Sequence, residues 1–140
     1  MRIVLAVDGS NYTKKALAFL VTHESLAGPD DEIVVVHAQP ALPPRVRSAV
    51  GSDVVKSYQS EEAEKVLLPI RRFLDKHDLK YRCEWSVGPA DDQILRTAKK
   101  AKAHLIVMGT HGHGVLGRTL MGSVAQKVVT GADVPVMLVK

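Results

Sequence analysis

Five short apolar runs, separated by segments with helical spacing, constrain the fold of this chain most strongly. They cover residues 3–7, 33–37, 81–87, 105–108 and 135–139. The run at 81–87 alternates polar and apolar side chains, which is typical of a strand near a sheet edge, whereas the other runs are those of buried strands. Strands that alternate with helices pair in parallel through right-handed crossovers. The sequence therefore predicts a single, open, doubly wound α/β sheet of five parallel strands.

Four helices are expected to alternate with these strands. The first two are placed at about residues 11–22 and 53–77, the third starts at Asp91 or Asp92 and carries Ile94, Leu95 and Ala98, and the last covers residues 124–130. Ser10 or Asn11 is suited to cap the first helix, because both side chains can accept a backbone N–H. Pro69 should kink or break the second helix. The proline-rich segment 39–47 has no periodicity and is predicted to be a mobile surface loop.

Length and composition indicate one domain over residues 1–140, with a core of its own. No apolar stretch has the length of a membrane span, and the N-terminal segment lacks the pattern of a signal peptide, so a cytoplasmic location is expected. The single cysteine, Cys83, excludes an intrachain disulfide. The formal charge is +4, but lysines and arginines are dispersed and only 4% of residues are aromatic, which argues against nucleic-acid binding.

A glycine-rich segment joins the strand at 105–108 to the last helix. Its fixed positions are Gly109, Gly112, Gly122 and Ser123. Glycine lets a backbone approach a ligand closely, and a helix N-terminus offers free N–H groups to an anion. The Ser123 hydroxyl could cap the helix or donate to a phosphate oxygen. The segment is predicted to bind phosphate; the alternative is a long loop with glycines at its turns and no ligand.

The sequence excludes two better-known phosphate-binding loops. A Walker A loop requires a lysine directly before Ser123, where this chain has Gly122. The dinucleotide fingerprint would follow the first strand, where only Asp8-Gly9-Ser10 is found.

The carboxyl ends of the predicted strands carry Asp8, Ala38, Gly88 and Gly109. Ligands of doubly wound sheets bind outside these ends, where the strand order reverses. Asp8 has two acceptor oxygens that suit neighbouring hydroxyl donors. Its alternative role is to cap the first helix.

The spacing Gly-x2-Gly-x9-Gly-Ser resembles that of ATP-binding universal stress proteins, and the resemblance covers essentially the whole chain. It includes Val-Asp-Gly-Ser at 7–10, Val-Gly-Pro-Ala at 87–90, Met-Gly-Thr-His-Gly at 108–112 and Val-Pro-Val-Met-Leu-Val at 134–139. The resemblance implies an adenine nucleotide alpha hydrolase-like fold with strand order 3-2-1-4-5. It also implies a cytoplasmic protein, usually dimeric, that is tied to survival under stress and holds ATP.

The resemblance assigns ten residues to the nucleotide. They are Ala6, Val7, Asp8, Ala38, Met108, Gly109, Gly112, Gly122, Ser123 and Val124. Asp8 would bond to the ribose hydroxyls, and the main chain of Ala38 would read the adenine edge. Ala6 and Val7 would flank the base, and Met108 would pack on base or ribose, with a core role equally open. The glycines, Ser123 and Val124 would present backbone amides to the phosphates.

Three further side chains fall within the glycine-rich segment. Arg118 would either contact the γ-phosphate or be solvated. His111 and His113 are expected to face solvent, because no cysteine or nearby carboxylate completes a zinc site.

The sequence offers no general base, Walker B aspartate or acidic pair for two metals, so a binding protein is expected. It would hold ATP, with Mg²⁺ carried by the phosphates, and act as a nucleotide-dependent module in the stress response. A slow ATPase or phosphotransferase and a nucleotide-free dimerisation module are the alternatives. The apolar fifth strand predicts a homodimer through Val136, Met137, Leu138 and Val139.

Overall fold

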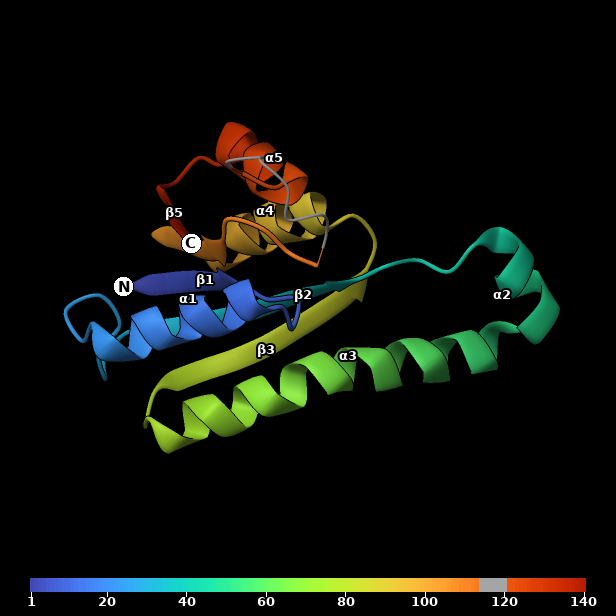
Figure 1. Ribbon diagram of the computed structural model, residues 1–140, viewed down its shortest axis with the longest axis horizontal. Coiled ribbons are helices and arrows are strands. Elements are labelled where there is room, and N and C mark those ends of the chain that lie inside the picture. Colours follow the sequence, from blue (N-terminus) through green and yellow to red (C-terminus); the bar gives the residue numbers. More distant parts are fainter. Residues whose placement is uncertain (114–120) are drawn as a thin grey trace.

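The computed structural model describes residues 1–113 and 121–140, which form a five-stranded sheet with helices on both faces (Figure 1). The strand order is β3-β2-β1-β4-β5, and every neighbouring pair is parallel. The strands are β1 (Arg2–Ala6), β2 (Glu32–Gln39), β3 (Lys80–Val87), β4 (Leu105–Gly109) and β5 (Val136–Val139). The doubly wound sheet and its strand order are confirmed, and β3 lies at an edge as its alternating pattern predicted.

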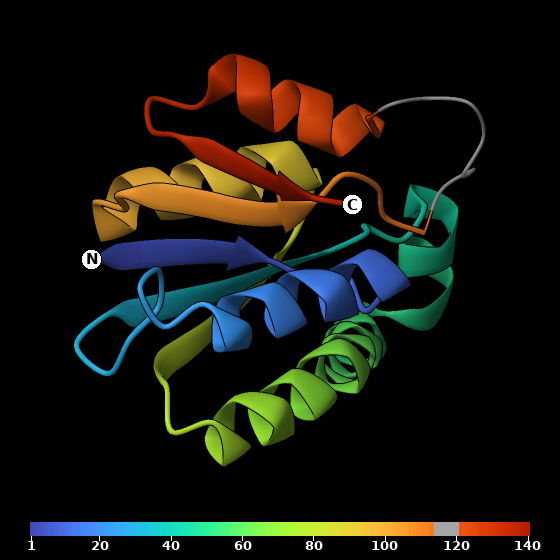
Figure 2. The same ribbon diagram turned by 60° about the vertical axis from the view of Figure 1, so that its left-hand side comes forward.

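Five helices, rather than the expected four, lie within the described residues. They are α1 (Asn11–Thr22), α2 (Pro44–Val50), α3 (Ser52–Lys76), α4 (Ala90–Ala101) and α5 (Ser123–Gly131). In Figure 2, α1 and α3 cover one face of the sheet, and α4 and α5 cover the other. The sheet has one hydrophobic core on each face. Each central strand contributes to both of them, because successive side chains of a strand point to opposite faces. In β1, Ile3 and Leu5 pack in the core under α1 and α3, whereas Val4 and Ala6 pack under α4 and α5.

Helix α2 corrects the prediction of a mobile loop over residues 39–47. Pro43 is extended, with φ −56° and ψ 144°, and Pro44 occupies the first turn of the helix, where its missing N–H has no cost. The helix buries none of its side chains. Its apolar residues Val46 and Val50 are 40% and 42% exposed, and seven residues next to two prolines are too few for a helical period to be recognised in the sequence.

Helix α3 continues through Pro69 over 25 residues, so of the two predicted effects, a kink or a break, the break does not occur. Four apolar side chains hold its inner face against the sheet: Ala63, Leu67, Ile70 and Leu74. Pro69 is exposed. The hydrogen bond that it cannot make is therefore lost on the solvent side, where water can satisfy the carbonyl.

The switch in strand order lies between β1 and β4 at the centre of the sheet. The chain leaves β1 toward β2 and reaches β4 from β3, so the segments after β1 and β4 diverge over opposite faces. This divergence opens the space that the functional site requires. None of the helices formed by residues 1–113 and 121–140 is long and apolar enough to cross a membrane.

Candidate functional site

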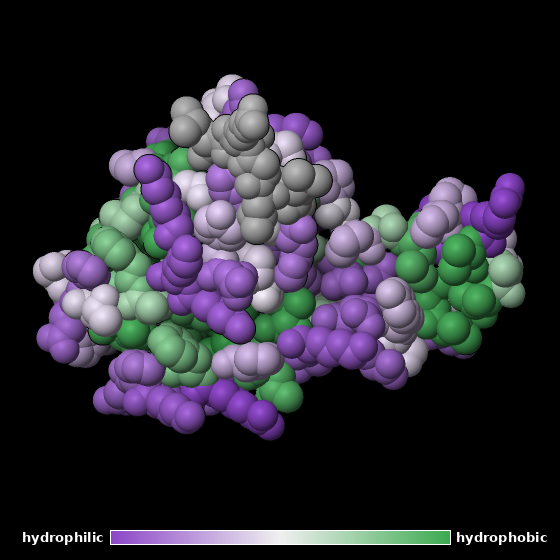
Figure 3. Space-filling view, in the orientation of Figure 1, coloured by the Kyte–Doolittle hydropathy of each residue, from purple (hydrophilic) through white to green (hydrophobic). Residues whose placement is uncertain are grey.

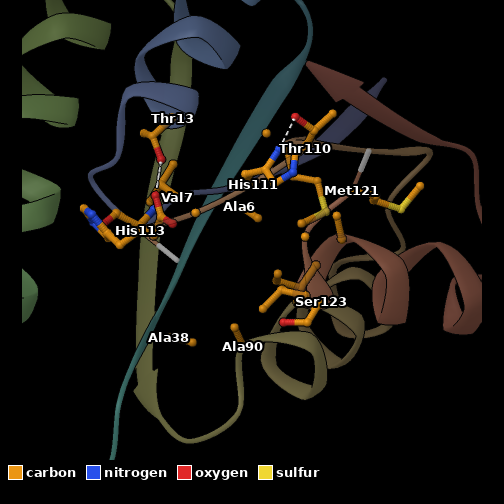
Figure 4. A pocket seen from close by; sticks show the side chains of 18 of the residues that line it. Ala6, Val7, Thr13, Ala38, Ala90, Thr110, His111, His113, Met121 and Ser123 are labelled. Atoms are coloured by element: carbon orange, nitrogen blue, oxygen red, sulfur yellow. Dashed lines mark hydrogen bonds between the residues drawn. The ribbon is translucent and has the colours of Figure 1, made fainter. Parts of the chain in front are cut away.

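A cavity of about 550 Å³ lies at the carboxyl ends of β1, β2 and β4, against the start of α5 (Figure 4). All ten residues assigned from the sequence line it: Ala6, Val7, Asp8, Ala38, Met108, Gly109, Gly112, Gly122, Ser123 and Val124. The fold therefore brings together residues that are up to 118 positions apart in the chain. Gly88 also follows a strand but does not line the cavity; its N–H donates to the Gln39 carbonyl at 3.1 Å.

The carboxylate of Asp8 is held by the first turn of α1. Its Oδ1 atom accepts hydrogen bonds from the Ser10 N–H and the Thr13 hydroxyl, both at 2.9 Å. The Asp8 N–H in turn donates to Thr13 Oγ1 at 3.0 Å. Ser10 caps α1 by accepting the Thr13 N–H, which confirms the cap expected there. Asp8 thus contributes to the helix start with one oxygen only.

The second oxygen, Oδ2, has no hydrogen-bond donor among the described residues and lies beside Gly112. A Cβ atom at position 112 would overlap it. Since Asp8 and Gly112 both line the cavity, Oδ2 is an acceptor available at its wall. The two roles considered for Asp8 are therefore compatible, with one oxygen for each.

The other two motif glycines are required by close packing of the protein itself. A Cβ at Gly109 would overlap Cβ of Tyr12 in α1. At Gly122, a Cβ would lie 3.1 Å from the Thr110 carbonyl oxygen and 3.3 Å from Cα of His111, which is tighter than ordinary contact. These glycines thus let α1 and the start of α5 approach the end of β4.

The start of α5 presents N–H groups at the cavity. The first turn contains Ser123, Val124 and Ala125, whose N–H groups have no acceptor within residues 1–113 and 121–140. The Gly122 N–H differs, because it donates to the Thr110 carbonyl at 2.7 Å. The Gly122 amide, which was predicted to face the phosphates, is therefore bonded within the protein in this structure. The Ser123 hydroxyl is exposed, and no hydrogen bond joins it to residues 1–113 or 121–140.

Apolar side chains form the remaining wall. Ala6 and Met108 are buried against α4 and α5, and Val7 is buried on the opposite face of the sheet, yet all three reach the cavity. Met108 therefore belongs to both the core and the cavity wall. Ala38 is half-buried at the end of β2, facing Ala90 across the opening (Figure 4).

The two histidines of the glycine-rich segment differ in their contacts. His113 is exposed, as expected, but its Nε2 lies 2.6 Å from the backbone carbonyl oxygen of Asp8. His111 is half-buried; its Nδ1 lies 3.0 Å from Thr110 Oγ1 and its ring lies 5.2 Å from that of Tyr12. The prediction for Arg118 lies outside the described residues.

Thr13 is the positioning residue that the sequence reasoning missed. It is buried, bonds to both the carboxylate and the N–H of Asp8, and lines the cavity. A threonine three positions after a helix cap, with an aspartate before that cap, is the signal that could have identified it.

Comparison of the sequence with known proteins identifies the family to which the chain belongs. The sequence model described as the universal stress protein family matches residues 1–140. The chain belongs to the universal stress protein family. A universal stress protein of Thermus aquaticus is 34% identical over 140 residues, which cover 99% of this chain and 97% of the relative.

Two solved structures share the fold. That of the Methanocaldococcus jannaschii protein MJ0577 matches with a TM-score of 0.84 at 24% identity, over 99% of this chain and 94% of that protein. That of the Archaeoglobus fulgidus universal stress protein in complex with dAMP matches with a TM-score of 0.71 at 26% identity, over 100% and 98%. Family membership and fold are thus established for this chain.

Proposed function

We propose that this universal stress protein binds ATP in the cavity at the carboxyl ends of the sheet and acts as a nucleotide-dependent module in the stress response. One observation carries the proposal: one cavity of about 550 Å³ is lined both by the Asp8 carboxylate and by the start of α5, whose first N–H groups have no acceptor among residues 1–113 and 121–140. This volume lies within the range of small-molecule sites, about 300–1,000 Å³. The dAMP complex of the Archaeoglobus fulgidus relative supports an adenine nucleotide as the ligand.

The chemistry of the cavity wall fits the three parts of the nucleotide. Asp8 Oδ2 would accept a ribose hydroxyl, since it has no other donor within the described residues. The N–H groups of Ser123 and Val124 and the Ser123 hydroxyl would bind phosphate oxygens, aided by the positive end of the helix dipole. The base would lie against the apolar wall, with the main chain of Ala38 at its edge.

Mg²⁺ would be carried by the phosphates. The described residues include no group of three or more histidine, cysteine or acidic side chains placed to hold a metal ion. Magnesium ions commonly keep several water ligands and bind through substrate phosphates. The metal would thereby offset phosphate charge without a dedicated protein site.

A homodimer through β5 forms part of the proposal. This strand lies at the edge of the sheet, and all four of its apolar side chains are only half-buried within one chain. The four residues are Val136, Met137, Leu138 and Val139. Pairing with a second copy would cover them and satisfy the open backbone edge.

Calorimetric titration with Mg·ATP, ADP and AMP tests the binding site. We expect Gly112→Ala to weaken ATP binding, because its Cβ would displace the Asp8 carboxylate. Gly28→Ala is the matched control: its Cβ would also be crowded, 3.1 Å from the Glu24 carbonyl oxygen, but Gly28 does not line the cavity. The assignment of ATP to this cavity would be contradicted if both variants bound ATP like the parent, or if both lost ATP binding to the same extent.

The state of the nucleotide distinguishes a binding protein from an enzyme. Protein purified without added nucleotide is denatured, and the released adenine nucleotides are separated by chromatography. Stoichiometric ATP supports the proposal. Release of ADP or AMP alone, together with turnover that Gly112→Ala abolishes, would favour a slow ATPase.

A further inference from the structure

Four exposed apolar side chains follow one another at the corner between α2 and α3. Of the eight large apolar side chains that are exposed among the described residues, these four fall within residues 46–58. They are Val46, Val50, Val54 and Tyr58, and 40–54% of each is exposed. Figure 3 shows apolar residues gathered on the surface over α2 and the start of α3. We call these four side chains the α2–α3 patch; none of them lines the nucleotide cavity proposed above.

The segment that carries the patch packs little against the rest of the described chain. Helix α2 buries no side chain, and the first buried residue of α3 is Gln59, its eighth residue. Neither helix has a side-chain hydrogen bond at its N-cap. Helix α2 and the start of α3 extend beyond the carboxyl ends of the strands (Figure 1). Helices as short as α2 are marginal in water and are stabilised mainly by the packing of an apolar face. A surface that covers the patch would therefore stabilise α2.

Charges of opposite sign lie at the two ends of the patch. Helix α2 carries Arg45 and Arg47, one on either side of Val46, and no acidic residue. In α3, Glu61 follows Tyr58 by three positions, so the two side chains lie on one face of the helix. Within the described part of the chain, neither arginine nor Glu61 has an ion-pair partner within 4.0 Å, and all three are exposed. The charged side chains of residues 52–65 are mainly acidic: Asp53, Glu61, Glu62 and Glu64, against Lys56 and Lys65.

This order of charges makes the patch complementary to itself. A contact about a two-fold axis uses the same residues on both sides, so its surface must match its own rotated copy. When two copies meet antiparallel, the arginines of α2 in each copy face the acidic stretch of α3 in the other, and the apolar side chains cover one another. A partner with charges of one sign only would match one end of the patch and repel the other.

We propose that the α2–α3 patch docks against the same patch of a second copy of this chain. A groove lined by Arg47 of α2, Val55 of α3 and Trp85 of β3 places the patch at the β3 edge of the sheet, whereas β5 forms the opposite edge. The two contacts can therefore coexist, and the patch would join β5 dimers into tetramers. The patch contact itself depends neither on the nucleotide cavity nor on the β5 dimer proposed above.

The contact should be weak in a single pair of chains. Four apolar side chains on each partner are far fewer than the roughly 20–30 residues a side that stable interfaces use. Association through one patch is therefore expected only well above micromolar concentration. A β5 dimer presents two patches, and binding through both would strengthen the association without any new contact.

Sedimentation velocity from micromolar to millimolar concentration measures the association. With rising concentration, the parent should convert to a species of twice its starting mass. Val54→Glu should weaken this step about tenfold or more, because the two-fold contact brings two like charges together on an apolar surface. Val129→Glu is the matched control, since Val129 is similarly exposed, at 44%, but lies in α5 on the other face of the sheet. No association of the parent, or equal loss in both variants, would overturn the proposal.

A charge exchange identifies the partner as a second copy. One variant combines Arg45→Glu with Arg47→Glu, and the other combines Glu61→Arg with Glu62→Arg. Each alone should lose the association step, because like charges would then meet at both ends of the contact. An equimolar mixture should recover it, since each end of a mixed pair again joins opposite charges. Circular dichroism checks that both variants keep their fold. A mixture that stays unassociated would refute the contact between copies.

The outcome can be separated from that of the function proposed above. Leu138→Asp, which removes the β5 contact, should leave monomers that still pair through the patch at millimolar concentration. Val54→Glu in the same background should stay monomeric. Gly112→Ala, which removes ATP binding, should leave the association unchanged. Monomers of Leu138→Asp that do not pair at millimolar concentration would contradict the patch contact and leave the β5 dimer and the nucleotide site untouched.

Discussion

Replacing Asp8 by asparagine separates the two roles of its side chain. The Oδ1 atom accepts from the Ser10 N–H and the Thr13 hydroxyl, and asparagine keeps a carbonyl oxygen at this position. At the Oδ2 position, asparagine has an NH2 group that cannot accept a ribose hydroxyl. Asp8→Asn should therefore preserve the start of α1 and weaken nucleotide binding. Asp8→Ala would lose both functions.

The expected loss follows from the bonds removed. Hydrogen bonds to a charged acceptor contribute about 1–3 kcal/mol, which corresponds to roughly 5- to 150-fold weaker ATP binding. Asp8 is half-buried, so its bonds to ligand would be only partly exposed to competing water. Asp8→Ala should in addition lower the free energy of unfolding by about 1 kcal/mol, as other losses at a helix start do.

Calorimetric titration with ATP, 2′-deoxy-ATP and 3′-deoxy-ATP measures this contact. The parent should prefer ATP to at least one deoxy form, and Asp8→Asn should lose that preference, which isolates the pairwise interaction. Thermal unfolding checks that Asp8→Asn retains its fold. The reasoning is refuted if Asp8→Asn binds ATP like the parent, or if its preference among the three nucleotides is unchanged.

Three further perturbations test other parts of the structure. Gly109→Ala should lower the free energy of unfolding by about 1–3 kcal/mol, because its Cβ would overlap Cβ of Tyr12; unchanged urea unfolding would contradict this. Burial and a hydrogen bond to Asp75 raise the pKa of Tyr81 from 10.0 to about 12, so the stability given by its neutral phenol should be lost as the pH rises from 10 toward 12. Tyr81→Phe should show a shallower decline in that range, and parallel declines would argue against it. Leu138→Asp should convert the proposed dimer to a monomer in light scattering, and a parent that is already monomeric at micromolar concentration would exclude the β5 interface.

The sequence predicted best those elements whose apolar pattern is complete. Helix α1 occupies residues 11–22 as expected, because Ser10 marks its start and Leu17 and Leu20 mark its buried stripe. Helix α2 was missed because it has only seven residues and begins directly after Pro43, and prolines in a short segment favour the interpretation as a loop. A kink or a break was predicted at Pro69 because the local effect of a proline is visible in sequence, whereas the packing that keeps α3 continuous against the sheet is not.

The sequence predicted which residues meet at the candidate site, but it did not predict the contacts that they make there. The ten assigned residues share one cavity, since strand ends meet wherever parallel strands are ordered in this way. The sequence could not show that the Gly122 N–H bonds to Thr110, or that Gly109 is required by Tyr12. Such contacts depend on how closely two segments approach each other in the folded chain, and the spacing of residues along the sequence does not specify this.

The most direct test of the central claim is a nitrogen–proton NMR titration of the protein with Mg·ATP. Backbone amides around the cavity, above all those of Ser123, Val124 and Asp8, should shift in a saturable manner, while the indole N–H of Trp85, which does not line this cavity, should not move. An unchanged spectrum, or shifts confined to residues outside the cavity, would contradict the proposal that ATP binds between Asp8 and the start of α5.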